Sequence, residues 1–148
     1  VAAATLAAAA AFLDDVSVGP AAAAVRDAAT AMHDPTEGGL LTALVETASA
    51  SGTELAVERE RVPVRPETRA CCDALDVDPL ATFGSGALLA AVLPKRVDDA
   101  LDSLADAGID AAVIGDVRAA DERDAGSVRL DGDRIDEAPR DELYPLWE

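Results

Sequence analysis

Two adjacent glycines at the start of an apolar helical repeat constrain this chain more than any other feature. Residues 31–41 read Ala-Met-His-Asp-Pro-Thr-Glu-Gly-Gly-Leu-Leu, and apolar residues then recur at helical spacing as far as Ala50. Asp-Pro and Thr are typical of the turn that precedes a helix. Because the first N–H groups of a helix lack partners within it and lie at the positive end of its dipole, such a turn can bind a phosphate. A capped turn that merely enters a core helix would have the same sequence.

The length and the apolar content indicate one compact domain. The chain has 148 residues, of which 50% are hydrophobic, enough for a single core over residues 1–148. The apolar opening, residues 1–13, stops at Asp14, is too short to span a bilayer and lacks the basic start of a secretory signal. We therefore expect a core helix there, in a cytoplasmic protein that does not contact a membrane.

The charge balance excludes nucleic acid as a partner. There are 29 acidic and 12 basic residues, a net charge of −17, so no basic patch can form to neutralise phosphates. The carboxylates are spread along the whole chain, Lys95 is the only lysine, and aromatic residues make up 3%. This acidic composition predicts a halophilic protein, in which salt screens the self-repulsion of the surface.

The residue types that most often bind metals are sparse. Cys71 and Cys72 are adjacent and His33 is the single histidine, so no zinc ligand set is present, and we predict no metal site. The two cysteines are interpreted as small helix residues. The acidic residues 121–124 are interpreted as a solvated loop, with a cation site as the alternative.

Hydrophobic periodicity predicts alternating helices and strands. A helix from Pro20 should bury Val25, Ala28, Ala29 and Met32, and the next helix should occupy residues 39–50. Pro94 opens another helix that Gly108 closes, and Asp131-Gly132 suits a hairpin turn at a sheet edge. The flanking strands should form a right-handed crossover around that helix. The other expected elements are strands at residues 55–57, 87–93 and 111–117, a helix at 67–75, and an apolar C-terminal plug of Tyr144, Leu146 and Trp147.

Four motifs in this order resemble one known family. They are residues 31–40, Val62-Pro63-Val64-Arg65, residues 75–80 (Leu-Asp-Val-Asp-Pro-Leu), and a glycine loop that precedes an apolar strand. Together they resemble the C-terminal domain of the aminoimidazole ribonucleotide (AIR) synthase superfamily (PurM-like), over nearly the whole chain. Within it, the chain looks most similar to the hydrogenase expression/formation proteins of the HypE type and to AIR synthase-related proteins.

The resemblance implies an α/β (α+β) domain in which helices pack on a mixed sheet. In this superfamily such a domain follows an N-terminal domain, absent from this chain, that dimerises and binds ATP and Mg²⁺. Members activate an oxygen atom by phosphorylation. The site residues that the resemblance implies, as contacts to nucleotide or substrate phosphate, are Asp34, Thr36, Gly38, Gly39, Gly84, Ser85 and Gly86. Thr36 would cap the helix or donate its hydroxyl, and the glycine N–H groups would meet the anion.

The chain departs from the HypE pattern at two places. Glu37 stands where the HypE turn commonly has arginine, and the chain ends Leu146-Trp147-Glu148 without the terminal cysteine that carries the group to be dehydrated. We therefore expect an AIR synthase-related protein of unassigned substrate.

Two functions remain open from the sequence. In one, this domain supplies substrate and phosphate contacts to an ATP-dependent enzyme, and is inactive as a separate fragment. Its partners are then its own N-terminal domain, a second copy in a homodimer, and a phosphate-bearing or other small-molecule substrate. In the other, the domain is a non-catalytic partner-binding or regulatory surface. A Gly38→Val change should abolish ligand binding in the first case and leave the fold largely intact.

Overall fold

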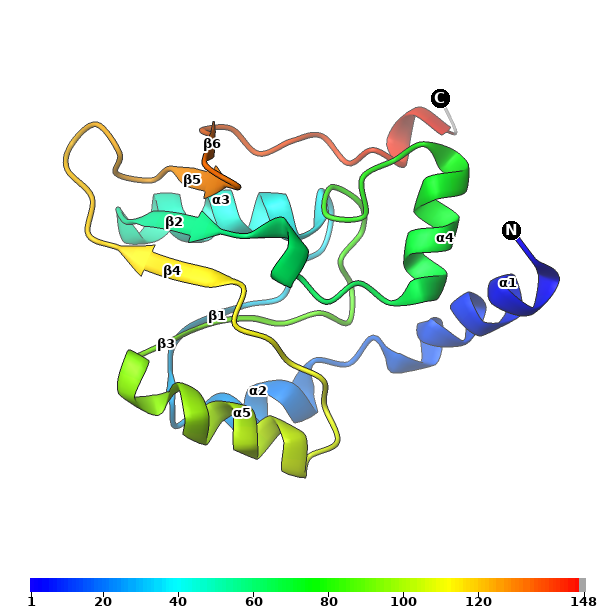
Figure 1. Ribbon diagram of the computed structural model, residues 1–148, viewed down its shortest axis with the longest axis horizontal. Helices are drawn as coiled ribbons and strands as arrows, with labels where there is room; N and C mark the ends of the chain where they lie inside the picture. Colours follow the sequence, from blue (N-terminus) through cyan, green and yellow to red (C-terminus); the bar gives the residue numbers. More distant parts are fainter. Residues whose placement is uncertain (147–148) are drawn as a thin grey trace.

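The fold combines five α-helices and six strands in the part of the chain that the structure, a computed structural model, describes, residues 1–146 (Figure 1). The helices are α1 (Ala3–Ala10), α2 (Gly19–Val25), α3 (Gly39–Ser51), α4 (Pro66–Leu75) and α5 (Val97–Asp106). The strands are β1 (Ala29–His33), β2 (Glu54–Val57), β3 (Leu89–Val92), β4 (Gly115–Arg118), β5 (Val128–Leu130) and β6 (Asp133–Ile135). The predicted α/β class, with helices on a mixed sheet, is confirmed.

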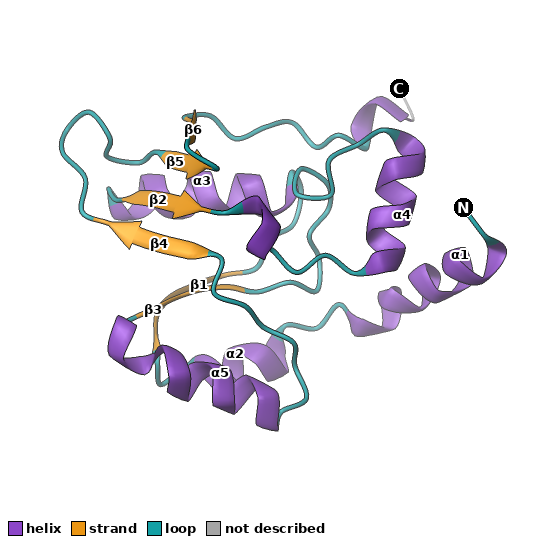
Figure 2. Ribbon diagram, in the orientation of Figure 1, coloured by secondary structure: helices purple, strands orange, loops and turns teal. Residues whose placement is uncertain are grey.

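The larger sheet has the order β4-β2-β5-β6, and α3 lies along one of its faces (Figure 2). Strands β2 and β5 are parallel, with Leu55 opposite Val128, and the other pairs are antiparallel. Alternation along each strand sends apolar side chains toward α3. The core is formed by Leu41, Leu44, Val45 and Ala48 of α3 against Leu55, Val57, Val128 and Leu130. Burial of these side chains fixes where α3 begins relative to the sheet.

A second layer consists of the antiparallel pair β1–β3 with α2 and α5. Its small core contains Val25, Ala28 and Ala100, with Leu104 packed against them. Figure 1 shows α2 and α5 side by side, below β1 and β3. This layer places His33, at the end of β1, next to the turn that enters α3.

Several predicted elements are confirmed. Helix α3 occupies almost the expected residues and ends at Gly52, whose φ of +65° is the left-handed cap that glycine favours. Strand β2, helix α4 and helix α5 also form where periodicity predicts them. The hairpin turns through Asp131 and Gly132, both at positive φ, and β6 is the edge strand, as expected.

Other predictions are wrong, because tertiary pairing overrides local pattern. The second helix ends at Val25, and residues 29–33 form a strand, since Ala29–His33 finds backbone partners on β3. Residues 111–114 are not strand, and β3 is half-buried rather than enclosed on both faces. Strands β3 and β4 belong to different sheets, so the expected right-handed crossover does not exist.

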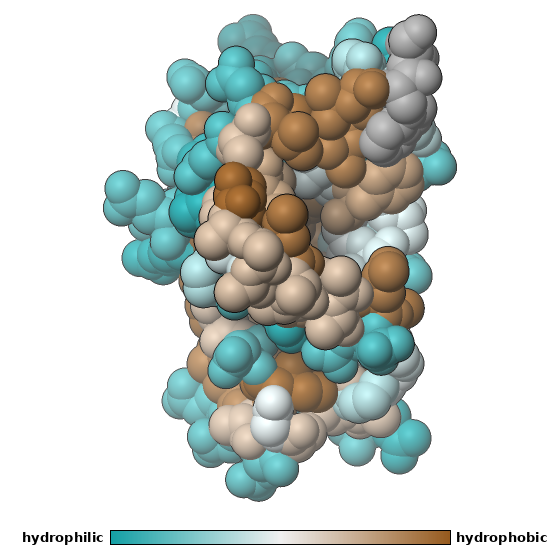
Figure 3. Space-filling view, turned by 90° about the vertical axis from the view of Figure 1, so that its right-hand side faces the viewer, coloured by the Kyte–Doolittle hydropathy of each residue, from teal (hydrophilic) through white to brown (hydrophobic). Residues whose placement is uncertain are grey.

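The alanine-rich opening is the segment whose burial differs most from the prediction. Helix α1 forms but buries no residue, so it is not the core helix that its composition predicts. It contacts α4, and the Arg65 guanidinium lies 4.5 Å from the centroid of the Phe12 ring in the turn that follows α1. Figure 3 shows apolar residues gathered on this side of the molecule. Leu6 of α1 and Leu13 of the turn that follows are 51% and 78% exposed.

Burial in α4 and in the C-terminal segment is limited to a few side chains. In α4 the buried residue is Cys72, whereas Ala74 and Leu75 point to solvent. Burial raises the pKa of the Cys72 thiol. In the expected C-terminal plug, Tyr144 packs edge-on against Phe83, Leu146 is 48% exposed, and Trp147 lies outside the described residues.

Over residues 1–146, no individual helix has the length and apolar character to cross a bilayer. The bent pair Ala3–Asp15 and Gly19–Val25 reaches that threshold in length and composition alone.

Candidate functional site

The turn between β1 and α3 is held by backbone contacts and by one distant carboxylate, without a cap from the turn's own side chains. Gly38 is the N-cap, with φ of +71°, and Gly39 follows at +60°, conformations that side chains other than glycine rarely adopt. The carbonyl of Thr36 accepts the N–H of Gly39 at 3.1 Å. No side chain caps α3, so the capping role expected for the Thr36 hydroxyl is wrong. An N–H group at this helix start is instead satisfied from a distant segment, since the Leu41 N–H donates to the Leu80 carbonyl at 3.0 Å.

The second glycine loop, residues 84–86, contacts this turn directly. The N–H of Gly84 donates to the same Thr36 carbonyl at 2.9 Å, and a Cβ atom at Gly84 would lie 2.7 Å from the Cβ of Pro35. Glycine is therefore required for the two loops to approach each other. The resemblance predicts that both loops belong to one site, and the structure brings them into direct contact.

A pocket opens where the two loops meet. It encloses about 390 Å³ including its open mouth, and its lining consists of Val16, Val18, Asp34, Pro35, Thr36, Ser85 and Gly86. Four of the seven expected site residues therefore share one cavity. The Asp34 side chain is 67% exposed, and no basic side chain lines this pocket. The chemistry available is hydroxyl, carboxylate and backbone.

The other glycines lie beside the pocket rather than in its wall. The N–H of Gly38 donates to Oδ2 of Asp141 at 2.8 Å, in a buried hydrogen bond. Gly39 is enclosed, since a Cβ atom there would lie 2.3 Å from the carbonyl oxygen of Thr82. In this structure both glycine N–H groups have partners within the chain, the Asp141 carboxylate for Gly38 and the Thr36 carbonyl for Gly39.

The Gly38→Val expectation also needs correction. A Cβ atom at Gly38 would lie 2.1 Å from Oγ1 of Thr42, and the residue has positive φ. Valine at this position would disturb the fold as well as any ligand contact, so this variant cannot separate the two effects.

Glu37, the departure from the HypE-type turn, has a partner in the C-terminal segment. The pKa of the Tyr144 hydroxyl is raised, chiefly by hydrogen bonding to the nearby Glu37 carboxylate. The guanidinium carbon of Arg140 lies 5.6 Å from the centroid of the same ring. The pairing of Glu37 with Tyr144 could not be read from the sequence, because the two residues lie more than 100 positions apart.

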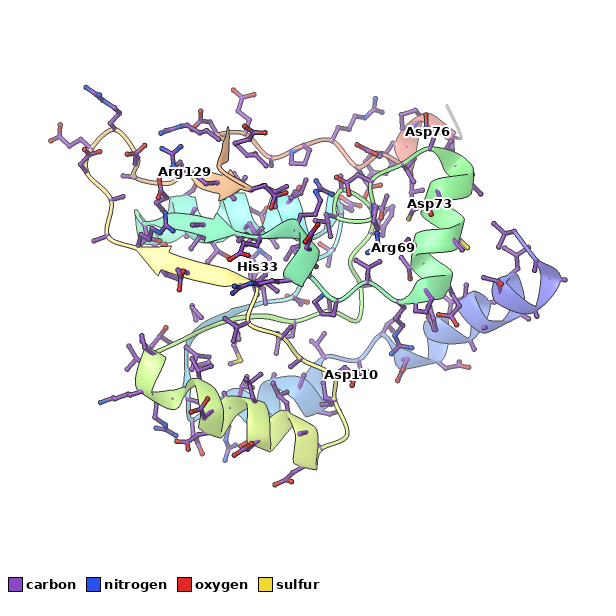
Figure 4. The ribbon with its side chains drawn as sticks, viewed as in Figure 1. His33, Arg69, Asp73, Asp76, Asp110 and Arg129 are labelled. Atoms are coloured by element: carbon purple, nitrogen blue, oxygen red, sulfur yellow. The ribbon has the colours of Figure 1, made fainter. Side chains whose placement is uncertain are left out.

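A second, mostly apolar cleft lies between the two sheets. Met32, Leu44, Leu55, Leu89 and Val117 are among its lining residues. His33 reaches this cleft (Figure 4), and its Nε2 lies 2.6 Å from Oε2 of Glu46. The sequence marked His33 as the sole histidine but not its pairing with Glu46 on α3.

Acidic residues elsewhere form ion pairs with arginines. Asp124, in the loop that was expected to be solvated, pairs with Arg134 and with Arg129, labelled on β5 in Figure 4. Arg129 also binds Glu54 at 2.7 Å across the outer face of the larger sheet. Among residues 1–146 the structure places no three His, Cys, Asp or Glu side chains together so that they could hold a metal ion.

Comparisons with known proteins identify the family that this chain matches. The sequence profile of the AIR synthase related protein, C-terminal domain, matches residues 5–126. Carbamoyl dehydratase HypE of Rhizobium leguminosarum bv. viciae is 39% identical over 92 residues, which are 61% of this chain and 26% of that protein. HypE of Azotobacter vinelandii is 36% identical over 94 residues, 62% of this chain and 28% of that protein.

Solved structures show the same relationship. A crystal structure of E. coli HypE, a hydrogenase maturation protein, has a TM-score of 0.71 at 29% identity, covering 86% of this chain and 42% of that one. HypE in complex with ATP has a TM-score of 0.62 at 34% identity, covering 74% and 36%. This chain thus spans only about a quarter of the length of the curated relatives named above. With its profile match, its two joined glycine loops and its mixed sheet, the chain belongs to the AIR synthase related protein, C-terminal domain family.

Proposed function

We propose that this domain supplies the phosphate-contacting and substrate-contacting wall of an ATP-dependent AIR synthase-related enzyme that activates an oxygen atom by phosphorylation. The observation that carries the proposal is the shared pocket, in which Asp34 and Thr36 of one glycine loop face Ser85 and Gly86 of the other. The ATP complex of the relative HypE supports a nucleotide as one ligand.

The residues of the pocket fit a phosphate only in part. Hydroxyls and backbone groups can donate hydrogen bonds to phosphate oxygens, but the pocket has no basic side chain to balance their charge. We infer that Mg²⁺, held by groups outside this chain, neutralises the phosphate. The domain then orients the ligand and is inactive as a fragment, and a preceding N-terminal domain and a homodimer complete the enzyme.

Titration calorimetry with ATP and Mg²⁺ in molar KCl tests the proposal. It compares the 148-residue chain with the longest natural protein that contains it. We expect binding in the longer protein, at least tenfold weaker in Thr36→Val and Ser85→Ala, because each variant removes a hydroxyl donor from the pocket. Ser103→Ala is the control, since Ser103 is exposed on α5 and its hydroxyl donates only to the Asp99 carbonyl of its own helix. If all three variants bind ATP with equal affinity, the pocket is not part of the nucleotide site.

A non-catalytic, partner-binding role is the second candidate. It is favoured by one observation, the use of the glycine turn by this chain's own Asp141 and Tyr144. If the longer protein binds neither ATP nor phosphate, this second function replaces the first.

A further inference from the structure

Residues 139–146, here called the C-terminal strap, run from the region after β6 past the start of α3 toward the end of α4 (Figure 1). The strap is fastened at several points. Its Glu142 N–H donates to the carbonyl of Ala81 at 3.0 Å, and the Glu142 carboxylate accepts the N–H of Asp78 at 2.5 Å. The hydroxyl of Thr42, in the first turn of α3, donates to the carbonyl of Pro139 at 3.3 Å. The strap therefore contacts both segments that surround the glycine turn.

Asp141 is the central contact of the strap. Its side chain is buried, with 3% of the residue exposed, in a protein whose other carboxylates are mostly solvated. One carboxylate oxygen accepts the Gly38 N–H at 2.8 Å, and the other accepts the Leu143 N–H at 2.9 Å. A carboxylate thus occupies the position at a helix start where an external anion would receive the same hydrogen bond.

Tyr144 closes the turn from a nearby position on the strap. Its ring stands edge-on to Phe83, with the ring centroids 5.9 Å apart, and its hydroxyl lies near the Glu37 carboxylate. Position 37, where the chain departs from the HypE pattern, therefore lies beside the strap. A glutamate that would repel a phosphate at this turn is compatible with a tyrosine hydroxyl.

We propose that the C-terminal strap is an intramolecular ligand of the glycine turn, and that it must be released before a phosphate group can bind to the Gly38 amide. The inference rests on the proposed function, because it assumes that the turn can accept phosphate. Since the strap belongs to the same chain, it competes at a high effective concentration. The apparent affinity for phosphate then equals the intrinsic affinity multiplied by the fraction of molecules in which the strap is released.

Asp141→Asn tests the central contact with little change in size. The carboxylate accepts two N–H groups, whereas an amide has a single acceptor oxygen, so the variant must lose one of the two bonds. Inorganic phosphate is titrated at constant ionic strength while amide chemical shifts and amide hydrogen exchange are recorded. We expect Asp141→Asn to bind phosphate at least tenfold more tightly than the unaltered chain, with a shift of the Gly38 amide. The Glu142 amide should lose protection.

Two further variants complete the design. Tyr144→Phe keeps the ring on Phe83 but removes the hydroxyl beside Glu37, so we expect about a threefold gain in phosphate affinity. Glu137→Gln, at an exposed position before the strap, removes the same charge as Asp141→Asn and should stay within twofold of the unaltered chain. If Asp141→Asn does not fold, Tyr144→Phe carries the comparison. In the unaltered chain, phosphate should speed exchange of the Glu142 amide, because binding and release are linked.

Two results would overturn the strap proposal. One is a released strap, shown by fast exchange at Glu142, without any gain in phosphate affinity. The other is a Glu142 amide that stays protected in Asp141→Asn, which would mean that Asp141 does not hold the strap. The proposed function fails on a different readout, the dependence of ATP and Mg²⁺ binding on Thr36 and Ser85, so the two failures can be told apart.

Discussion

The guanidinium of Arg59 binds the carboxylate of Asp78 through two parallel hydrogen bonds, each 2.8 Å long. Arg59 follows β2, and its own N–H donates to Asp131 in the hairpin turn at 2.9 Å. Asp78 also accepts the N–H of Leu80, and the Leu80 carbonyl in turn accepts the N–H of Leu41 in α3. This one pair therefore links the larger sheet, the hairpin and the start of the helix on which the candidate site depends.

Asp78→Asn should lower the free energy of unfolding by about 1–3 kcal/mol, because a charged, two-bond contact is lost from a half-buried place. Urea unfolding in molar KCl measures the change. Glu58→Gln is the control, since the Glu58–Arg61 pair is more exposed, with side chains 59% and 53% accessible. We expect less than about 0.5 kcal/mol there. Similar losses in the two variants would show that the Arg59–Asp78 pair has no special role.

The same pair predicts an acid dependence. Burial alone would raise the pKa of Asp78, but hydrogen bonds from Arg59 and from the Leu80 N–H outweigh it and lower the pKa below its ordinary value. The stabilisation is fully present above the pKa of an unfolded aspartate, about 3.9, and is lost as the pH falls through the lower folded value. Stability measured from neutral pH downward should decline less steeply in Asp78→Asn than in the unaltered chain. Parallel curves would contradict the assignment.

Gly39→Ala should destabilise the protein by about 3 kcal/mol or more, because the new Cβ would meet backbone atoms at positive φ. The nearest atoms are the carbonyl oxygens of Thr82 at 2.3 Å and Leu80 at 2.7 Å, which cannot rotate away as a side chain would. Gly108→Ala provides a matched control, since Gly108 has a φ of +71° but a Cβ atom there would meet nothing within 4 Å. Gly108→Ala should lower the free energy of unfolding by only about 1 kcal/mol. Thermal unfolding of both variants separates steric contact from backbone strain.

The net charge of −17 predicts that stability rises with salt. Screening weakens attraction within exposed pairs such as Arg96–Asp99, but such pairs contribute about 0–1 kcal/mol each, whereas repulsion acts among all 29 acidic residues. The melting temperature should therefore increase as KCl is raised from about 0.1 M to molar levels. Sorbitol, an uncharged solute, is the control for general solvent effects. If the melting temperature in dilute buffer equals that in molar KCl, the halophilic prediction is wrong.

The order of motifs was enough to predict the family and the α/β class, and periodicity was enough for the elements whose signal is local. Helix α3 is the clearest case, with apolar residues at helical spacing and a glycine at each end. The hairpin is similar, because Asp131-Gly132 adopts the positive φ that its turn needs. The approach of the two glycine loops was also predicted, through the resemblance.

Periodicity failed where partners decide the structure. Residues 29–33 fit a helix as well as a strand, and only the backbone of β3 selects the strand. The alanines of α1 suit a core helix in composition, yet the described chain has no element that encloses them. The sheet to which β3 and β4 each belong likewise depends on distant segments, which local spacing does not report.

By itself, the sequence determined the acidic surface, the helix that begins at Gly39 and the family, because composition, local backbone preference and motif order are properties of neighbouring residues. Only the tertiary structure decided that the Asp141 carboxylate accepts the Gly38 N–H and that the Tyr144 hydroxyl lies near the Glu37 carboxylate. The Gly38–Asp141 contact joins groups 103 positions apart, and its geometry depends on how the strap folds over the loop at residues 78–83. No local pattern encodes such a contact, because it forms only when burial of the shared core brings both segments together.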